Sequence, residues 1–225
     1  VVILSGGLDS TTCMAVAANE GCEIYALTFD YGQRHRREVD CARRVAEHFG
    51  VREHRIVRMD FLKQIGGSAL TDSRLEIPSD GPGEEIPNTY VPGRNLIFLS
   101  LAASYAEAVG AGNIFIGVSA VDYSGYPDCR PDFIEAVNRV LQVGTRAGDR
   151  SEPIVIRAPL IRLSKAETIK LGHRLGAPYH LTTSCYRGGE RACGTCDSCR
   201  LRLKGFREAG LTDPIPYEER SRGLS

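Results

Sequence analysis

Two groups of residues in this 225-residue chain have the types and spacing that are typical of binding sites for an anion or a metal ion. The first is the stretch SGGLDSTT, residues 5–12, which directly follows the apolar run VVIL. The second is a set of four cysteines near the carboxyl end. A glycine bend before a helix presents free backbone N–H groups to an anion, and closely spaced thiolates bind a metal ion. We therefore expect one anion site and one metal site.

The glycine-rich stretch is typical of a phosphate loop, although it lacks the lysine of the common P-loop. Gly6 and Gly7 permit positive φ and a close approach of the backbone to a ligand. The residues that follow predict a helix, whose N-terminus favours negative charge. The hydroxyls of Ser5, Ser10 and Thr11 offer further donors. The alternative is a tight turn in which Ser10 only caps the helix.

A lysine far along the chain is a second candidate for contact with phosphate. Ser164 and Glu167 form an S-x-x-E capping box, which places Lys165 at the first position of a helix. A cation there opposes the helix dipole at a cost of about 0.3 to 1 kcal/mol. A bound phosphate would offset that cost. The alternative is a lysine that extends into solvent.

The four cysteines have the spacing C-x7-C-x2-C-x2-C, and glycines between them give the chain freedom to fold around one ion. Such a set suits tetrahedral zinc, and a site closed by four cysteines has no open position for water, so its role is structural. An iron–sulfur cluster uses similar spacings, and disulfides are rare in the cytosol. The predicted zinc ligands are Cys185, Cys193, Cys196 and Cys199.

Apolar runs of strand length alternate with helical patterns along the chain. The expected strands are residues 1–5, 23–32, 53–59, 113–120 and 154–160. Apolar residues at helical spacing predict helices near 39–49 and 131–141, and residues 95–110 are apolar nearly all round, which predicts the most buried helix. This alternation predicts an α/β fold with a parallel sheet and helices on both faces.

We expect an α/β domain over residues 1–178 and a small cysteine-containing element and tail over residues 179–225. The segment from Asp60 to Pro92 contains glycine, proline and acidic residues without a sustained period, which predicts a long excursion able to act as a lid.

Charge and hydropathy exclude several classes of protein. Lys plus Arg and Asp plus Glu both number 28, so the net charge is zero and a general nucleic-acid binder is disfavoured. No apolar segment approaches the roughly 20 residues that a membrane span needs, and no signal peptide is evident. We expect a cytoplasmic protein with no membrane or nucleic-acid partner.

The motif S-G-G-x-D-S-[ST], matched in full by residues 5–11, resembles the signature of the ATP pyrophosphatases, the PP-loop superfamily. The resemblance implies a Rossmann-like adenine nucleotide alpha hydrolase fold, ATP with Mg²⁺, attack on the α-phosphorus and release of pyrophosphate. It also implies catalytic roles for Asp9, near the magnesium or pyrophosphate, and for Lys165; the alternative for Asp9 is a carboxylate favoured in the first turn of a helix. The nucleotide-binding candidates are Leu4, Ser5, Gly6, Gly7, Leu8, Asp9, Ser10, Thr11, Thr12 and Lys165.

Three further stretches, TFDYGQRH, YVPGRN and SGYPDCRP, complete a second resemblance. Together with the loop and the cysteines they resemble the 7-cyano-7-deazaguanine synthase family of queuosine biosynthesis over essentially the whole chain. The resemblance implies that 7-carboxy-7-deazaguanine and ammonia become the nitrile by way of an amide, with two ATP consumed. It also implies a homodimer.

A planar purine-like base needs an aromatic or apolar slot and a carboxylate facing its N–H donors. Suitable residue types occur in the three stretches, although which aspartate faces the base stays open. Ordinary packing is the alternative for the tyrosines, and helix-end hydrogen bonding for the arginine and asparagine. We expect Cys129 to be a half-buried thiol rather than a nucleophile. The substrate-binding candidates are Tyr31, His35, Arg94, Asn95, Asp122, Tyr123, Tyr126 and Asp128.

Other functions remain open from the sequence. One is another ATP pyrophosphatase, such as a tRNA-thiolating enzyme or an amidating synthetase; neutral charge and the lack of a Cys-x-x-Cys near the loop disfavour thiolation. A relative that attaches a deazaguanine to a protein is a second. The third is a zinc-knuckle nucleic-acid-binding module with a vestigial nucleotide loop.

Overall fold

The computed structural model describes residues 1–31, 37–72, 75, 86–121 and 126–218. In this part of the chain five strands form one parallel sheet, in the order β3-β2-β1-β4-β5. The register pairs Val2 of β1 with Ala26 of β2 on one side and with Phe115 of β4 on the other. The strands are β1 (Val2–Ile3), β2 (Tyr25–Asp30), β3 (Glu53–Arg58), β4 (Asn113–Phe115) and β5 (Val155–Arg157).

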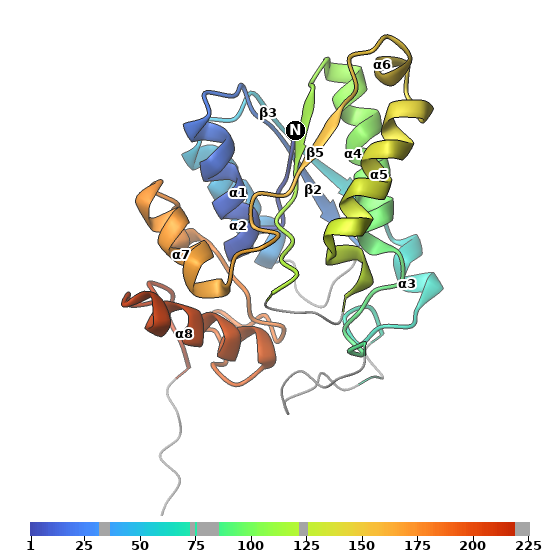
Figure 1. Ribbon diagram of the computed structural model, residues 1–225. Coiled ribbons are helices and arrows are strands. Elements are labelled where there is room, and N and C mark those ends of the chain that lie inside the picture. The colour runs from blue at the N-terminus through green and yellow to red at the C-terminus, as the bar shows by residue number, and fades with distance from the viewer. Residues whose placement is uncertain (32–36, 73–74, 76–85, 122–125, 219–225) are drawn as a thin grey trace, which may run out of the picture.

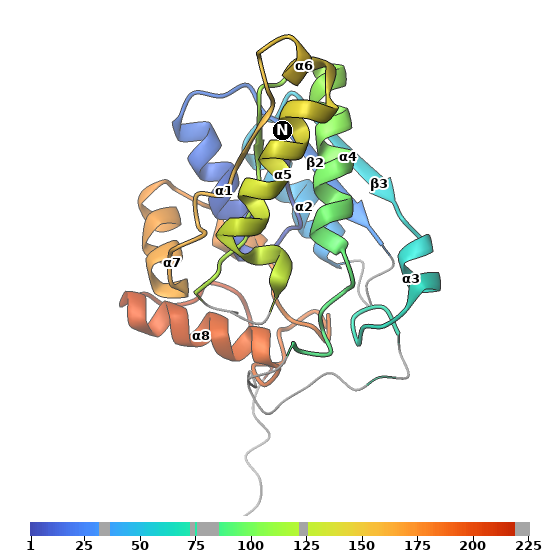
Figure 2. The same cartoon turned by 45° about the vertical axis from the view of Figure 1, so that its right-hand side comes forward.

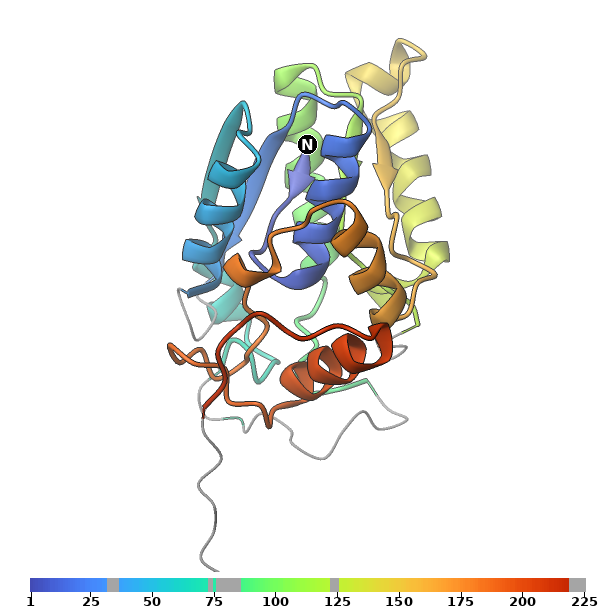
Figure 3. The same cartoon turned by 90° about the vertical axis from the view of Figure 1, so that its left-hand side faces the viewer.

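Helices cover both faces of the sheet (Figures 1 and 2). Helices α1 (Leu8–Asn19) and α2 (Arg37–His48) lie on one face, and α4 (Arg94–Val109) and α5 (Pro131–Gly144) lie on the other. Figure 3 shows α1 and α2 from the outside, with the last helix below them at the carboxyl ends of the strands. The remaining elements are α3 (Phe61–Ile65), η1 (Pro127–Cys129), α6 (Arg146–Asp149), α7 (Lys165–Arg174), η2 (Tyr179–Leu181) and α8 (Asp197–Ala209).

Side chains alternate between the two faces of the sheet along each strand, so one sheet contributes to two hydrophobic cores, one on each face. Along β1 and its flanking residues, Val1 and Ile3 pack in the cluster formed with α4 and α5. Val2 and Leu4 point the other way, into the cluster formed with α1 and α2. Because successive side chains of a strand face opposite sides, an apolar run such as VVIL suits a central strand buried on both faces. The predicted two-sided parallel sheet is confirmed.

One expectation about the helices is wrong. The helix over residues 95–110 is not the most buried one: α4 buries seven of its 16 residues, whereas α1 buries eight of 12. The reason is that α1 lies between the sheet and α7, so it has neighbours on two sides. The 60–92 segment also contains α3, whose five residues are too short to show a helical period.

The carboxyl-terminal element packs directly on the first domain. Helix α8 contacts α7, and its Phe206 shares a buried cluster with Leu8 of α1 and Ile169 of α7. The division at residue 178 stays a prediction. Among the described residues, no helix has both the length and the apolar character that a bilayer crossing requires.

Candidate active site and metal centre

A cavity of about 310 Å³ lies at the carboxyl ends of β1, β2 and β4. Ligands in open parallel sheets bind at this edge, where the strand order reverses, and here the reversal falls between β1 and β4. The volume is within the usual range for small-molecule sites, about 300 to 1,000 Å³. The loop after β1, the end of β2 and the starts of α4 and α7 all contribute side chains to its wall.

Two glycines, one in the phosphate-loop candidate and one after β4, allow the backbone of neighbouring elements to come close to this loop. Gly6 has a φ of 81°, and a Cβ at this position would lie 2.2 Å from the carbonyl oxygen of Glu38 in α2. A Cβ on Gly117, after β4, would lie 2.8 Å from the carbonyl carbon of Asp9. Any larger residue would push α2 or β4 away from the loop.

The helix after the loop begins without a side-chain cap. Its N-cap is Gly7, which has no side chain to cap it. The Ser10 hydroxyl instead donates to the Gly7 carbonyl at 3.1 Å and lies 3.0 Å from the Ser5 hydroxyl. The simple capping role for Ser10 is therefore not what the structure shows. The hydroxyls hold the loop in shape, and the N–H groups in the first turn of a helix such as α1 are able to bind an anion.

The other loop candidates differ in where their side chains lie. Leu4 and Leu8 are buried and line the cavity. Thr11 and Thr12 are fully buried in α1, away from the cavity wall. The Thr12 hydroxyl donates to the Leu8 carbonyl at 2.9 Å and lies 2.8 Å from the Tyr179 hydroxyl. These two threonines thus support the loop from behind.

Lys165 and Asp9 meet at the edge of the cavity. The capping box of Ser164 and Glu167 is confirmed, and it starts α7 at Lys165. The Lys165 Nζ atom lies 2.7 and 2.8 Å from the two carboxylate oxygens of Asp9. The lysine side chain is only 11% exposed, so the alternative of a lysine extended into solvent is wrong. Gly205 of α8 leaves the space that its stem occupies.

A group of aromatic side chains, Phe29, Tyr31, Phe98 and Tyr126, forms an aromatic wall of the cavity. The Phe29 and Phe98 rings stack with centroids 4.1 Å apart, and Tyr31 packs on Phe98 at 5.7 Å. Tyr126 also lines the cavity, and its hydroxyl lies 2.6 Å from that of Thr89. The sequence predicted the tyrosines but not the phenylalanines. Their signal was present, because residue 29 shares a strand face with residue 31.

Arg94 and Asn95 occupy the start of α4, as expected, and both line the cavity. Arg94 supplies a positive charge there, whereas Asn95 is neutral. Burial alone would lower the pKa of Arg94, yet Tyr31 and Asp128 raise it above its usual value. Asn95 donates its backbone N–H to an Asp128 carboxylate oxygen at 3.1 Å and its side-chain amide to the Asp128 carbonyl at 3.1 Å. Asp128 therefore holds the helix start and is not part of the cavity wall.

Three substrate candidates, His35, Asp122 and Tyr123, lie outside the described residues. Cys129 is described and buried, and it lines the cavity. Burial raises the pKa of its thiol to about 12. The thiol is therefore protonated at neutral pH and is a poor nucleophile.

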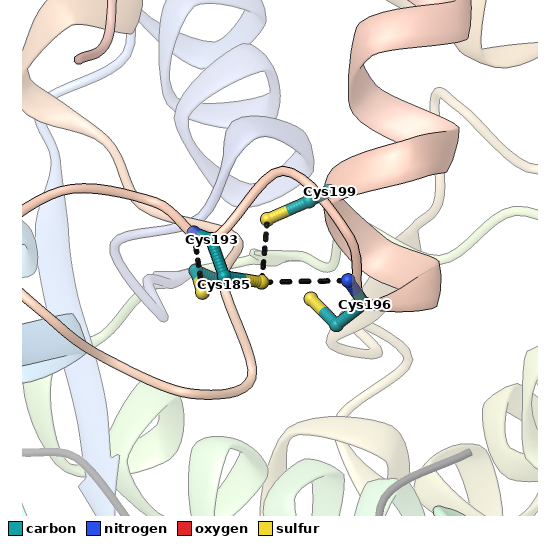
Figure 4. Close-up of side chains that lie close together, drawn as sticks. All are labelled: Cys185, Cys193, Cys196 and Cys199. Atoms are coloured by element: carbon teal, nitrogen blue, oxygen red, sulfur yellow. Dashed lines mark hydrogen bonds between the residues drawn. The ribbon is translucent and has the colours of Figure 1, made fainter. Parts of the chain in front are cut away.

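The four predicted metal ligands converge on one point (Figure 4). Their sulfur atoms all lie within 4.8 Å of one another, and all four residues are buried. Backbone N–H groups of Cys193 and Cys196 donate to the sulfurs of Cys185 and Cys193, both at 3.4 Å, which favours thiolates. Tetrahedral bonds of about 2.3 Å to zinc place sulfurs about 3.8 Å apart. The set therefore fits a metal, and the disulfide alternative is wrong because every cysteine is free.

The four-cysteine cluster and the phosphate-loop candidate are joined by one short segment, residues 182–185. The Thr183 N–H donates to the Gly6 carbonyl at 3.1 Å. Ser184 and Cys185 both line the cavity, so one cysteine of the cluster forms part of its wall. The cysteine-containing element thus contributes directly to the shape of the cavity.

A buried arginine that the sequence reasoning missed fixes this segment. Arg202 of α8 is 1% exposed and forms a two-point ion pair with Asp213, at 2.8 and 2.9 Å. Its remaining donors reach the hydroxyls of Thr182 and Ser184 and the Tyr179 carbonyl. Its signal was a charged residue three positions after Cys199, on the apolar face of a helix.

Comparison with known proteins assigns the family. Residues 1–210 match the family model described as queuosine biosynthesis protein QueC. The chain belongs to the QueC family. It is 64% identical to a 7-cyano-7-deazaguanine synthase of Oceanobacillus iheyensis, over 96% of this chain and 97% of that protein. It is 59% identical to one of Acetivibrio thermocellus, over 98% of both chains.

A solved structure supports the fold. The crystal structure of a 4-thiouridine synthetase–RNA complex with bound ATP superposes with a TM-score of 0.52 at 18% identity. The match covers 93% of this chain and 50% of that one. At this identity the likeness concerns the fold alone, and it supports the predicted α/β fold with a parallel sheet.

Proposed function

We propose that this chain converts 7-carboxy-7-deazaguanine and ammonia to 7-cyano-7-deazaguanine, cleaving two ATP to AMP and pyrophosphate through an adenylated acid and an adenylated amide. Family membership and the name of the relatives support this reaction. The observation that carries it is that the phosphate loop, Lys165 and the aromatic wall line one cavity. A nucleotide and a planar acid can therefore be held side by side.

The loop end of the cavity suits a departing pyrophosphate. The N-terminus of α1 and the Lys165 ammonium supply positive charge where the β- and γ-phosphates leave together. A lysine that bridges β and γ, as in the common P-loop, is not required for that cleavage. Asp9 offers carboxylate oxygens, the ligand type that Mg²⁺ prefers; when bound, Mg²⁺ would neutralise phosphate charge.

The other end suits the deazapurine. The stacked rings of Phe29 and Phe98, with Tyr31 beside them, offer an apolar surface to a planar base. Arg94 keeps its charge beside this wall and can bind the substrate carboxylate. Adenylation itself supplies the leaving group. The residues here therefore act mainly by positioning and by stabilising charge.

We propose zinc for the four-cysteine centre, with a structural role. Four sulfur ligands leave no position for a water, so a zinc ion there supplies cross-linking of the chain. Metal analysis of the purified protein checks this: one zinc per chain is expected, and iron with acid-labile sulfide would contradict it.

A cytoplasmic homodimer without a nucleic-acid partner completes the proposal. Free thiols and the use of ATP suit the reducing cytoplasm. Exposed apolar side chains on α4, Leu96 at 50% and Leu101 at 39%, offer surface for self-association. Light scattering should give twice the mass of the chain, and a monomeric mass at all concentrations would contradict it.

The reaction is tested by incubating the protein with 7-carboxy-7-deazaguanine, ammonium, Mg²⁺ and ATP, followed by mass analysis. The nitrile together with AMP is the expected result. ADP without AMP would contradict the role of the loop. Salt-dependent RNA binding without ATP turnover would favour a nucleic-acid-binding module instead.

A further inference from the structure

A buried tyrosine behind the cavity joins the two helices that begin at its phosphate end. Tyr179 of η2 is 5% exposed and is not among the described residues of the cavity wall. Its hydroxyl lies 2.8 Å from the Thr12 hydroxyl of α1 and donates to the Thr168 carbonyl of α7 at 3.2 Å. A buried tyrosine hydroxyl usually has such partners. One side chain therefore links α1 to α7, which pack against each other (Figure 3).

This link lies one helical turn behind the charged pair of the cavity. Asp9 and Thr12 are three residues apart on α1, and Lys165 and Thr168 are three residues apart on α7. Residues three apart in a helix are neighbours on its surface. Helices α1 and α7 are therefore joined twice, first by the ion pair of Asp9 and Lys165 at 2.7 Å and then by Tyr179.

The groups at this junction are packed closely. A Cβ on Gly172 of α7 would lie 2.0 Å from the Tyr179 hydroxyl oxygen and 3.0 Å from the Thr12 hydroxyl oxygen. Helix α7 thus approaches the tyrosine as closely as a glycine backbone allows. Burial raises the pKa of Tyr179 to about 12, the hydrogen bond with Thr12 lowers it, and the charge of Asp9 raises it. The hydroxyl therefore keeps its proton at neutral pH and remains a donor.

The carboxyl-terminal element holds the tyrosine in place. The Tyr179 carbonyl accepts hydrogen bonds from the Arg202 guanidinium at 3.3 Å and from the Thr182 hydroxyl at 2.7 Å. The Tyr179 ring meets the Phe206 ring of α8 edge-on, with centroids 5.6 Å apart. Backbone and ring are thus both held by residues that belong to neither α1 nor α7. The hydroxyl is therefore a fixed point to which both helices are bonded.

The phosphate end of the cavity depends on the spacing of these two helices. The N-terminus of α1 and the Lys165 ammonium are the positive groups proposed to hold the leaving pyrophosphate. One belongs to α1 and the other to α7, so a shift of one helix along the other changes the distance between them. A misplacement of about 1 Å can lower a rate by about 10²-fold. The stacked rings of Phe29 and Phe98, by contrast, belong to β2 and α4.

We propose that Tyr179 is a positioning residue for the pyrophosphate group, an assignment that rests on the proposed function. Its hydroxyl bridges Thr12 and the Thr168 carbonyl and so sets the distance between the N-terminus of α1 and Lys165. Because Tyr179 lies behind the cavity wall, it acts through the two helices and not by contact with the nucleotide. Loss of the hydroxyl should weaken binding of the phosphates and leave the deazapurine end unchanged.

The test is the exchange of labelled pyrophosphate into ATP by the Tyr179→Phe variant, with 7-carboxy-7-deazaguanine and no ammonium. The KM values for pyrophosphate and for ATP should rise by about tenfold, whereas the KM for the deazapurine acid should stay within about twofold of wild type. If Tyr179 only stabilised the fold, fewer molecules would be active, and kcat would fall with no change in any KM. That result, or an equal rise in all three KM values, would overturn the proposal.

A partner substitution and a control separate the alternatives. Thr12→Val removes the other hydroxyl of the link and should raise the same two KM values. The double variant should be no worse than either single variant, because each removes the same link, and additive effects would contradict the proposal.

Thr145→Val removes the hydroxyl cap of α6, at the far end of the molecule from α8 (Figure 1), and should lower stability without changing a KM. If Tyr179→Phe does not fold, Thr12→Val decides the question by the same pattern of KM values. Absence of pyrophosphate exchange in the wild type would refute the proposed function itself.

Discussion

The substitution Asp213→Asn tests whether the carboxyl-terminal element is held by a buried charge. Asp213 accepts two hydrogen bonds from the Arg202 guanidinium and a third, at 2.6 Å, from the Tyr217 hydroxyl. The Arg202 and Asp213 side chains are 2% and 3% exposed. Asparagine keeps the shape of aspartate but leaves the guanidinium buried without a counter-charge.

The expected loss is large for a single isosteric change. Removal of one partner from a buried ion pair costs about 3 to 5 kcal/mol, compared with a total stability of about 5 to 15 kcal/mol for a typical domain. With a urea m-value of about 3 kcal/mol/M, the unfolding midpoint should fall by about 1 to 1.7 M. Because Arg202 also holds Thr182 and Ser184, ATP turnover should fall as well.

Urea unfolding followed by circular dichroism measures the effect, with Glu208→Gln as the matched control. Glu208 pairs with Lys204 on the same helix at 3.7 Å, and these side chains are 49% and 60% exposed. Loss of such an exposed pair should cost less than about 0.5 kcal/mol. If Asp213→Asn stays within about 1 kcal/mol of wild type, the claim that Arg202 depends on this counter-charge is refuted.

Four further outcomes are expected. Lys165→Met should lower pyrophosphate exchange by about 10²-fold, whereas Lys170→Met, exposed on the same helix, should not change it. Gly6→Ala should abolish the reaction, because its Cβ would collide with α2, whereas Gly110→Ala, with nothing within 4 Å, should cost only about 1 kcal/mol in urea unfolding. Removal of the metal by a chelator should lower the melting temperature, and a metal-free protein of unchanged stability would contradict the structural role. Burial raises the pKa of Cys129 from its ordinary value near 9 to about 12. The protonated thiol therefore adds to the free energy of unfolding below about pH 9, and this contribution is lost as the pH rises toward 12. Between about pH 8 and pH 10, wild type should therefore lose about 1 kcal/mol more than Cys129→Ala.

The sequence alone determined the features that depend on local pattern. Alternation of apolar runs and helical periods predicted the parallel sheet, and the capping box placed Lys165 at the start of α7. Four cysteines at short spacing predicted a convergent metal site, because so few residues separate them that the chain must fold around one point. The glycines of the phosphate loop predicted a sharp turn after the first strand.

Only the tertiary structure decided the features that depend on which distant residues meet. Asp128 was one of two aspartates predicted to face the base, and the packing of α4 against η1 places one of its carboxylate oxygens at the start of α4. Glu38 is not among the residues that the sequence predicts for the site, and the close approach of α2 to Gly6 brings it to the cavity. Arg202 of α8 holds Thr182 and Ser184, and through the neighbouring Thr183 this segment contacts Gly6, about 200 residues earlier in the chain. Sequence patterns record what a residue prefers locally, whereas the long-range partner that satisfies a buried charge is set by the packing of whole elements.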